Sequence, residues 1–312
     1  MNDFLKLPKS YWMASTPQTS YPLLDDDITV DIAIVGGGIV GITSAYLLTE
    51  QGYKVAIIEA DRIVQGTTGH TTAKISSQHG LFYARLNKQL GEQKAKQYAQ
   101  ANESAIQEVA RIIQQESIDC DFTSQKAYVY TQDDEYLSQI KDEVGIAASL
   151  GIKASFLSEI PLPISIKGAV CFEDQAQFHP RKYLLSLADK VVANGSYIFE
   201  KTRAVDIIEG NPCAVITSSG KKIISPKIVI ASHYPFYEAH GLYFTRIYPD
   251  RSYILAVNAK EKFPGGMYIT AEDPTRSLRA QNYGDKELIL VGGEHHKTGQ
   301  GEDTIKDRKS VV

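Results

Sequence analysis

The stretch VDIAIVGGGIVGITSAYLLTEQGYKVAIIEA, residues 30–60, predicts a strand, a glycine turn, a helix and a second strand. Residues 30–35 are apolar apart from Asp31 and rich in β-branched side chains, as in a parallel strand buried on both faces. Residues 42–51 have helical character, and residues 53–58 form the second strand. This order is typical of a βαβ unit that binds a ligand at the carboxyl ends of its strands.

The turn carries the pattern G-x-G-x-x-G at Gly36, Gly38 and Gly41, with Gly37 between the first two. The first glycine allows a tight turn, the second lets a pyrophosphate approach the backbone, and the third lets helix and strand pack closely. Glu59 ends the second strand, near the spacing of about 20 residues expected of a ribose-binding carboxylate. These features predict a dinucleotide site rather than a βαβ unit with incidental glycines.

A loop rich in glycine, threonine and serine follows at residues 61–80. Because it follows the second strand, its start is expected at the carboxyl edge of the sheet, where ligands of open α/β sheets bind. Small hydroxyl side chains suit close packing around such a ligand. The alternative is an ordinary surface loop.

The remaining chain alternates between two kinds of structure. Residues 1–26 predict an extended arm that lies on the first domain, pinned by aromatic burial of Ser-Tyr-Trp at 10–12. Residues 83–117 predict one long helix, followed by mixed α and β structure. An α/β pattern returns at 179–233, where a His-Pro pair opens a helix, and β-rich chain follows. This alternation favours two domains that share the chain.

Composition narrows the functional classes. A chain of 312 residues is longer than one hydrophobic core usually serves, so two domains are predicted. The net charge of -4 gives no electrostatic reason to expect binding to nucleic acid or to an anionic membrane. No apolar run approaches a membrane span, and the N-terminus lacks the features of a signal peptide. Cys120, Cys171 and Cys213 are far apart without a C-x-x-C motif, so no metal site or disulfide framework is predicted. The cytoplasm is the expected location.

The glycine turn, Glu59, the GTTGHTT loop at 66–72 and the later GSYIFEKTRAV and KIVIAS segments resemble a known family. They are similar to FAD-dependent oxidoreductases of the D-amino-acid oxidase, glycine oxidase and sarcosine oxidase type. SYWMAST and LILVGGEHHKTGQG resemble bacterial members, including γ-glutamylputrescine oxidoreductases and a subgroup with a C-terminal Rieske iron–sulfur domain. The resemblance implies the α/β class, with a Rossmann-like FAD-binding domain interrupted by an α+β substrate domain whose sheet is mostly antiparallel.

The resemblance also implies domain limits. Residues 1–118 and 179–236 are expected to form the FAD-binding domain, and residues 119–178 and 237–306 the substrate domain. Residues 307–312 are a suspected non-native tail. The glycine-containing segment that closes the family's cofactor domain has no match here, so the chain is expected to be a C-terminally truncated fragment. A Rieske-type electron-transfer domain would belong to the full-length protein, since its paired C-x-H and C-x-x-H motifs do not occur in this sequence.

Cofactor contacts follow from the matching positions. Glu59 would hold the adenosine ribose, and Val205 would contact adenine through its backbone. The pyrophosphate would face Gly36, Gly37, Gly38 and Gly41. The loop that wraps the pyrophosphate and the flavin side would contribute Thr67, Thr68, His70, Thr71 and Thr72.

His70 and Arg279 are the candidates for a direct role in catalysis. His70 matches the histidine that is covalently joined to flavin in the G-T-T-W-H-T loop of dimethylglycine and sarcosine dehydrogenases. Gly69 stands where those have tryptophan, so a covalent link and a non-covalent histidine near the flavin both stay open. Arg279 is a candidate fork for a substrate carboxylate, and a surface arginine is the alternative. His233 follows a strand that would bring it towards the ligand edge.

The function implied is oxidation of a C–N bond of an amine or amino acid, with hydride transfer to flavin N5. The glycine turn and Glu59 alone would also fit an NAD-dependent dehydrogenase. A non-catalytic flavin-binding or electron-transfer protein is a third reading. The threonine-rich loop and the interrupted domain order favour FAD, while the electron acceptor and the particular amine stay open.

Overall fold

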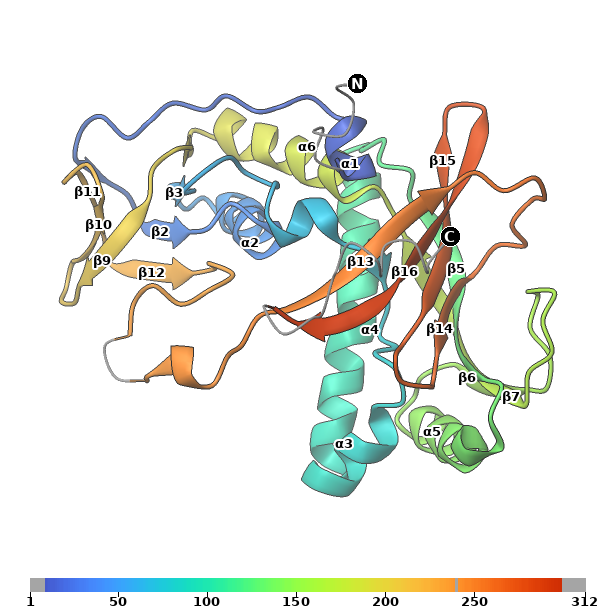
Figure 1. Ribbon diagram of the computed structural model, residues 1–312. Helices are drawn as coiled ribbons and strands as arrows, with labels where there is room; N and C mark the ends of the chain where they lie inside the picture. The colour runs from blue at the N-terminus through green and yellow to red at the C-terminus, as the bar shows by residue number, and fades with distance from the viewer. Residues whose placement is uncertain (1–8, 239–240, 299–312) are drawn as a thin grey trace. The chain divides into compact units, whose positions relative to one another are not determined.

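A computed structural model describes residues 9–238 and 241–298, which fall into two compact units. The first unit comprises Met1–Thr71 and His179–Tyr248, and the second comprises Thr72–Phe178 and Pro249–Val312 (Figure 1). Residues 72–118, which the sequence assigned to the FAD-binding domain, therefore group with the second unit. The suspected tail at 307–312 lies outside the described residues.

Four parallel strands form the central sheet of the first unit, in the order β12–β2–β3–β8. Every residue of β2 and β3 is buried, as their apolar, β-branched sequences predict. Helix α2 joins β2 to β3 and packs against α6, which precedes β8. The bounds are β2 (Ile32–Val35), α2 (Ile39–Thr49), β3 (Val55–Ile58), α6 (Pro180–Ala193), β8 (Tyr197–Phe199) and β12 (Lys227–Ile230).

A second sheet of four strands in this unit has the order β1–β11–β10–β9. Strands β10 and β11 form an antiparallel hairpin before β12, whose residues are partly or largely exposed. The arm carries a single helical turn, α1, which packs against α6 and against the 3-10 turn η1. The bounds are α1 (Tyr11–Ala14), β1 (Ile28–Thr29), η1 (Thr67–His70), β9 (Ala204–Ile208), β10 (Cys213–Thr217), β11 (Lys222–Ser225) and η3 (Tyr243–Thr245).

The second unit is built on a mostly antiparallel sheet of eight strands within the described part of the chain. The order is β13–β16–β15–β14–β5–β7–β4, with β6 also paired to β7, and only the β14–β5 pair is parallel. The bounds are β4 (Lys74–Ile75), β5 (Thr123–Thr131), β6 (Ala154–Leu157), β7 (Gly168–Gln177), β13 (Asp250–Val257), β14 (Met267–Thr270), β15 (Ser277–Tyr283) and β16 (Lys286–Lys297).

Two helices replace the single long helix predicted for residues 83–117. Gly91 has a φ of +81°, which ends α3 (Tyr83–Leu90) and starts α4 (Glu92–Gln115). The carboxylate of Glu143, on α5 (Leu137–Ser149), accepts hydrogen bonds from the first backbone amides of α3. A short 3-10 turn, η2 (Asp134–Tyr136), precedes α5.

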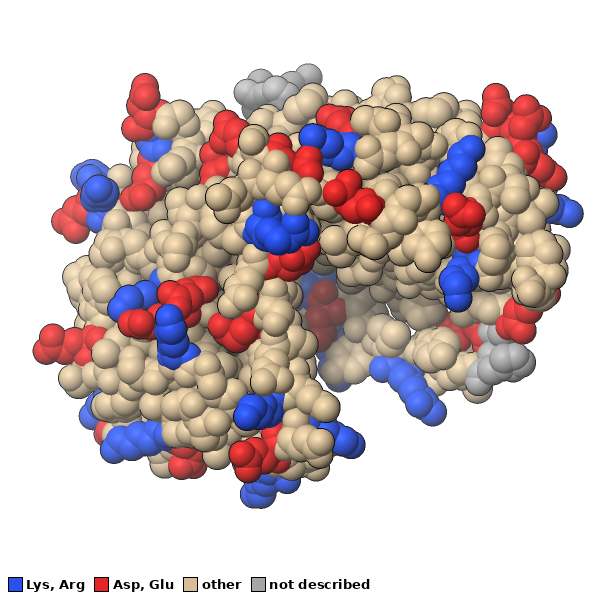
Figure 2. Space-filling view, turned by 180° about the vertical axis from the view of Figure 1, so that it is seen from behind, with Lys and Arg blue, Asp and Glu red and all other residues tan. Residues whose placement is uncertain are grey.

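The predicted fold class is confirmed, with a parallel sheet in one unit and a mostly antiparallel sheet in the other. Acidic and basic side chains are interspersed over the face shown in Figure 2, in keeping with a net charge of -4. Across residues 9–238 and 241–298, the helices are all too short or too polar to cross a membrane.

Candidate cofactor site

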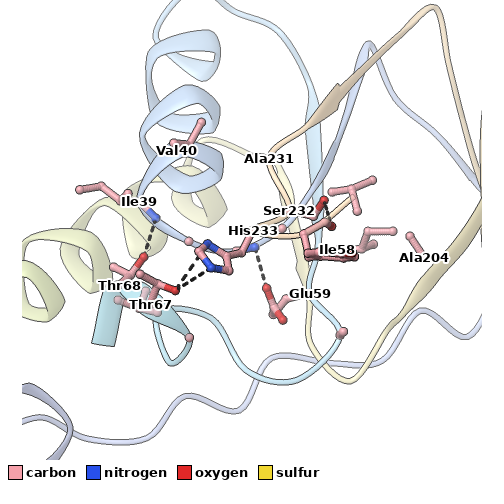
Figure 3. A pocket seen from close by; sticks show the side chains of 18 of the residues that line it. Ile39, Val40, Ile58, Glu59, Thr67, Thr68, Ala204, Ala231, Ser232 and His233 are labelled. Carbon is pink, nitrogen blue, oxygen red and sulfur yellow. Dashed lines mark hydrogen bonds between the residues drawn. The ribbon is translucent and has the colours of Figure 1, made fainter. Parts of the chain in front are cut away.

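A cavity of about 750 Å³ lies at the carboxyl ends of the parallel strands in the first unit (Figure 3). This volume is within the range of small-molecule and cofactor sites. Its wall combines the glycine turn after β2, the start of α2, the end of β3, and segments from the loop at 59–71. Residues 202–204 and 230–236 close the other side. The βαβ unit and the threonine-rich loop therefore meet at one site, where the sequence placed the ligand.

The glycines of the turn are required by close backbone contacts. Gly36 has a φ of +113°, and a Cβ on it would lie 2.7 Å from the carbonyl oxygen of Ala231. A Cβ on Gly41 would lie 1.9 Å from the carbonyl oxygen of Gly36, inside any allowed contact. A Cβ on Gly37 would lie 2.5 Å from Cγ2 of Ile63. Gly36, Gly37 and Gly38 line the cavity, whereas Gly41 lies outside its wall, so backbone without side chains faces the cavity at the turn and suits a pyrophosphate at a helix N-terminus.

Glu59 lies in the cavity wall and is held by the backbone. Its Oε2 accepts a hydrogen bond from the amide of Gly37 at 2.8 Å, and its Oε1 accepts one from the amide of Asp61 at 3.0 Å. A carboxylate can accept about four hydrogen bonds, so each oxygen retains capacity for a ligand hydroxyl. Glu59 is therefore oriented before any ligand binds.

Two threonines tie the loop to other parts of the cavity. The hydroxyl of Thr68 accepts a hydrogen bond from the amide of Ile39, at the start of α2, at 3.1 Å. The hydroxyl of Thr67 lies 3.4 Å from Nε2 of His233, in the segment that follows β12 (Figure 3). Thr71 also lines the cavity. The predicted loop residues 67, 68 and 71 thus share one site with His233.

His70 lies outside this cavity. Its Nδ1 donates a hydrogen bond to the carbonyl of Gly66 at 2.9 Å, and the ring lines a separate hollow beside the arm. Gly69 is buried, and a Cβ there would lie 3.1 Å from Sδ of Met13. The arm therefore occupies the space that a tryptophan at position 69 would need.

Two other predicted contacts fall elsewhere. Thr72 belongs to the second unit. Val205 is 47% exposed at an irregularity in the pairing of β9 with β10, and it is not part of the cavity wall. The residues just before it, Thr202, Arg203 and Ala204, line the cavity instead. The extra residue at this irregularity shifts the contact along the strand, which strand periodicity alone does not reveal.

Arg279 is neither a surface arginine nor a free fork. It is 1% exposed, and its guanidinium donates hydrogen bonds within the second unit. Nη1 reaches the carbonyls of Ala73 at 2.6 Å and Thr72 at 3.2 Å, and Nη2 bonds to the side chain of Gln281. Both readings made from the sequence are corrected, because the donors that would hold a substrate carboxylate are directed at protein oxygens.

Several cavity residues were not predicted from the sequence. Val40 is 59% exposed and Ile39 44% exposed, although both follow the glycine turn directly. Apolar residues that face no core at the start of α2 were a signal for ligand contact. Two cations also line the cavity, Arg62 and Arg203. Their positions beside Glu59 and the strand at 204 offered a weaker signal, because an isolated arginine is usually a surface residue.

Comparison with known proteins identifies the family. The model of the family described as "DAO: FAD dependent oxidoreductase" matches residues 31–311. The chain belongs to this family. FAD is therefore its cofactor, and the bare backbone of the glycine turn together with Glu59 fits the adenosine diphosphate part of that molecule.

Curated relatives cover nearly the whole chain. A putative Rieske 2Fe-2S iron-sulfur protein, YhfW, of Bacillus subtilis is 41% identical over 294 residues, which are 94% of this chain and 58% of that protein. The γ-glutamylputrescine oxidoreductase of Escherichia coli is 24% identical over 286 residues, 88% of this chain and 63% of that protein. The chain thus spans about three fifths of the length of these relatives.

Solved structures share the fold. Glycine oxidase from Bacillus cereus superposes with a TM-score of 0.68 at 21% identity, covering 90% of this chain and 76% of that one. L-proline dehydrogenase from P. horikoshii gives a TM-score of 0.70 at 20% identity, covering 91% and 75%. At these identities the likeness establishes the fold alone.

Proposed function

We propose that the full protein oxidises a C–N bond of an amine or amino acid, with FAD as the electron acceptor in the first step. The main support is the cavity of the first unit, whose wall includes the glycine turn. The chain that forms it belongs to the family of FAD-dependent oxidoreductases. Names of similar proteins support the substrate class, since one is a γ-glutamylputrescine oxidoreductase and others are a glycine oxidase and an L-proline dehydrogenase.

The cofactor would be held by the residues of this cavity. Amides of the glycine turn would face the pyrophosphate, with the start of α2 behind them. Glu59 would accept hydrogen bonds from the adenosine ribose, because two backbone amides already fix its carboxylate. Backbone at 202–204 would contact the adenine, in place of the predicted Val205. Thr67, Thr68 and Thr71 would wrap the pyrophosphate side.

FAD supplies a hydride acceptor for the carbon that bears the nitrogen, and the imine so formed is open to hydrolysis by water. The chain's part is to bind the cofactor in one position and to keep its adenosine end fixed. Thr68 contributes by joining the loop to the first amide of α2. His70 would stay a non-covalent residue beside the cofactor loop, because it lines a separate hollow and lies outside the cavity assigned to FAD.

Absorption and bleaching of the purified full-length protein test this proposal. We expect the absorption bands of flavin in the visible region, and their loss when a suitable amine or amino acid is added without oxygen. A colourless protein that binds NAD would overturn the cofactor assignment. A flavoprotein that no member of a broad amine and amino-acid panel bleaches would favour the electron-transfer alternative.

Acid precipitation addresses His70 separately. Flavin that stays wholly in the supernatant agrees with non-covalent binding, whereas flavin in the pellet contradicts it. His70→Ala serves as the matched variant, because a covalent link through this histidine would disappear with the side chain.

We also propose that the full protein passes electrons to a Rieske-type iron–sulfur centre. The support is the name of the Bacillus subtilis relative, which is 41% identical and extends well beyond the matched region. Electron paramagnetic resonance of the full-length protein after reduction by substrate should give a Rieske-type signal. A protein that transfers its electrons only to oxygen, without such a signal, would refute this assignment.

A further inference from the structure

Residues 10–21 of the N-terminal arm are fastened to the loop at 62–71, which carries cavity residues. At its first end, the hydroxyl of Ser10 donates a hydrogen bond to the carbonyl of Gly69. The indole Nε1 of Trp12 donates one to the carbonyl of Thr71 at 2.8 Å, and Trp12 is only 3% exposed. The arm therefore binds two backbone carbonyl oxygens of the loop through its side chains.

Arg181, at the start of α6, joins the arm and the loop from behind. Its Nη1 donates to the carbonyl of Val64 at 2.7 Å, and its Nη2 donates to the carbonyl of Pro17 at 2.8 Å. Its Nε donates to the hydroxyl of Thr16 at 2.7 Å. The side chain is fully buried, so these donors have no water to replace their partners. One guanidinium thus holds both segments in register.

Glu200, which follows β8, makes the equivalent connection at the other end of the arm. Its Oε1 accepts hydrogen bonds from the amide of Ile63, in the loop, and from the hydroxyl of Thr19, in the arm. Its Oε2 accepts one from the amide of Tyr21 at 3.0 Å. At 2% exposure, this carboxylate is also buried. A buried cation and a buried anion therefore link the arm to the loop at separate points.

The same loop supplies part of the cavity wall. Val64 and Thr71, whose carbonyls Arg181 and Trp12 bind, both line the cavity, as do the residues between them at 66–68. The loop has little regular structure of its own beyond the single turn η1. Its position therefore depends on outside contacts, and the arm together with α6 provides them.

We propose that the N-terminal arm sets the affinity for FAD by holding the loop at 62–71 in its binding position. Ser10, Trp12 and Arg181 are positioning residues in this scheme, since they contact the loop and lie outside the cavity wall. The inference rests on the assignment of the cavity to FAD, and it does not depend on which amine is oxidised.

Two substitutions in the arm test the proposal against a matched control. Trp12→Phe keeps an aromatic ring but removes the donor to Thr71, and Ser10→Ala removes the donor to Gly69. Tyr21→Phe is the control, because its hydroxyl bonds to Asp189 on α6 and not to the loop. We expect the dissociation constant of FAD, titrated into the apoprotein of the full chain, to rise about five- to tenfold in either test variant and to stay unchanged in the control.

Amide hydrogen exchange of the FAD-free protein gives a second readout. The amides of Val64 and Gly69 donate to Gly37 and Gly66, so they report on the order of the loop. Their exchange should accelerate in the two test variants, while exchange in β2 and β3 stays as in the wild type. A wild-type chain that binds no FAD would overturn the cofactor assignment. Faster exchange of the loop amides in the test variants would still show that the arm holds the loop in position. Equal exchange and equal FAD affinity in Trp12→Phe and Tyr21→Phe would overturn the proposal.

Discussion

Gly41 marks the closest approach of α2 to the turn that precedes it. Because an added Cβ would lie 1.9 Å from the carbonyl of Gly36, Gly41→Ala forces the helix away from the strand. We expect a loss of about 1–3 kcal/mol in unfolding free energy, together with at least tenfold weaker FAD binding. Chemical denaturation and FAD titration measure the two effects.

Gly145→Ala is the matched control for that change. Gly145 also lies in a helix, α5, and a Cβ there meets no atom within 4 Å. Alanine should stabilise this helix by about 0.5–1 kcal/mol and leave FAD affinity unaltered. If both alanine variants behaved alike, close packing at Gly41 would not be the cause.

Arg279→Lys separates a structural role from a substrate-binding one. Lysine cannot reproduce the fork that reaches Thr72, Ala73 and Gln281 together. We expect unfolding free energy to fall by about 3–5 kcal/mol, because buried acceptors lose their partners. An unchanged stability with a raised KM for carboxylate-bearing substrates would instead restore the fork that the sequence suggested.

Lys74 makes stability depend on pH. Burial, and next the charge of Arg279, lowers the pKa of Lys74 to about 7, and its Nζ donates to the carbonyl of Tyr268 at 3.2 Å. An unfolded lysine binds its proton up to about pH 10.4, so between these values the unfolded state binds more protons. Unfolding free energy should therefore rise with pH from about 7 to 10, relative to a Lys74→Met variant. Lys96→Met, an exposed change on α4, should leave the wild-type profile intact.

Gly36, Gly37, Gly38 and Glu59 lie together in the cavity wall, and their contacts with the cofactor stay predictions. The glycines and Glu59 lie within one βαβ unit, so their spacing along the chain fixes their geometry. Arg279 was misjudged because its acceptors at 72 and 73 are some 200 positions away in the sequence. No local pattern reports whether a distant carbonyl will meet an arginine.

At the level of elements, the start of α3 depends on a single acid from another helix. The carboxylate of Glu143 accepts from the amides of Phe82, Tyr83 and Ala84 at 2.8–2.9 Å, and it is fully buried. In Glu143→Gln, the side-chain NH2 group replaces one carboxylate oxygen. It would then face a backbone N–H group without being able to accept a hydrogen bond from it. We expect a loss of about 1–3 kcal/mol in unfolding free energy, measured by denaturation.

Glu92→Gln gives the comparison for this change. Glu92 lies in the exposed first turn of α4, where a carboxylate interacts only with the helix dipole. Its loss should cost no more than about 0.5 kcal/mol. If the two substitutions lowered the unfolding free energy equally, the buried hydrogen bonds of Glu143 would contribute nothing to stability.

Element boundaries were predicted less well than element types. The strand expected at 30–35 begins at Ile32, because the amide of Val30 donates to the carbonyl of Ile224 on β11, in the other sheet. The helix expected from residue 42 begins at Ile39, directly after Gly38. Helical periodicity runs through residues 83–117, so the break at Gly91 had only the glycine itself as a signal.

For the whole molecule, FAD is expected to stabilise the first unit more than the second. A ligand at 100 times its dissociation constant adds about 2.7 kcal/mol to the unit that binds it. Hydrogen exchange with and without FAD, compared between β2–β3 and β15–β16, measures the difference. Equal protection of both strand pairs would mean that the two units unfold together.

The order β12–β2–β3–β8 has a consequence for synthesis on the ribosome. Strands β2 and β3 leave the ribosome early, but both strands that flank them belong to residues 197–230. At about 5–20 residues per second, roughly 10–40 s pass before the second of these flanking strands is made. Throughout that interval at least one edge of the β2–β3 pair is unpaired, and such an apolar edge can associate with other chains until its neighbour is made.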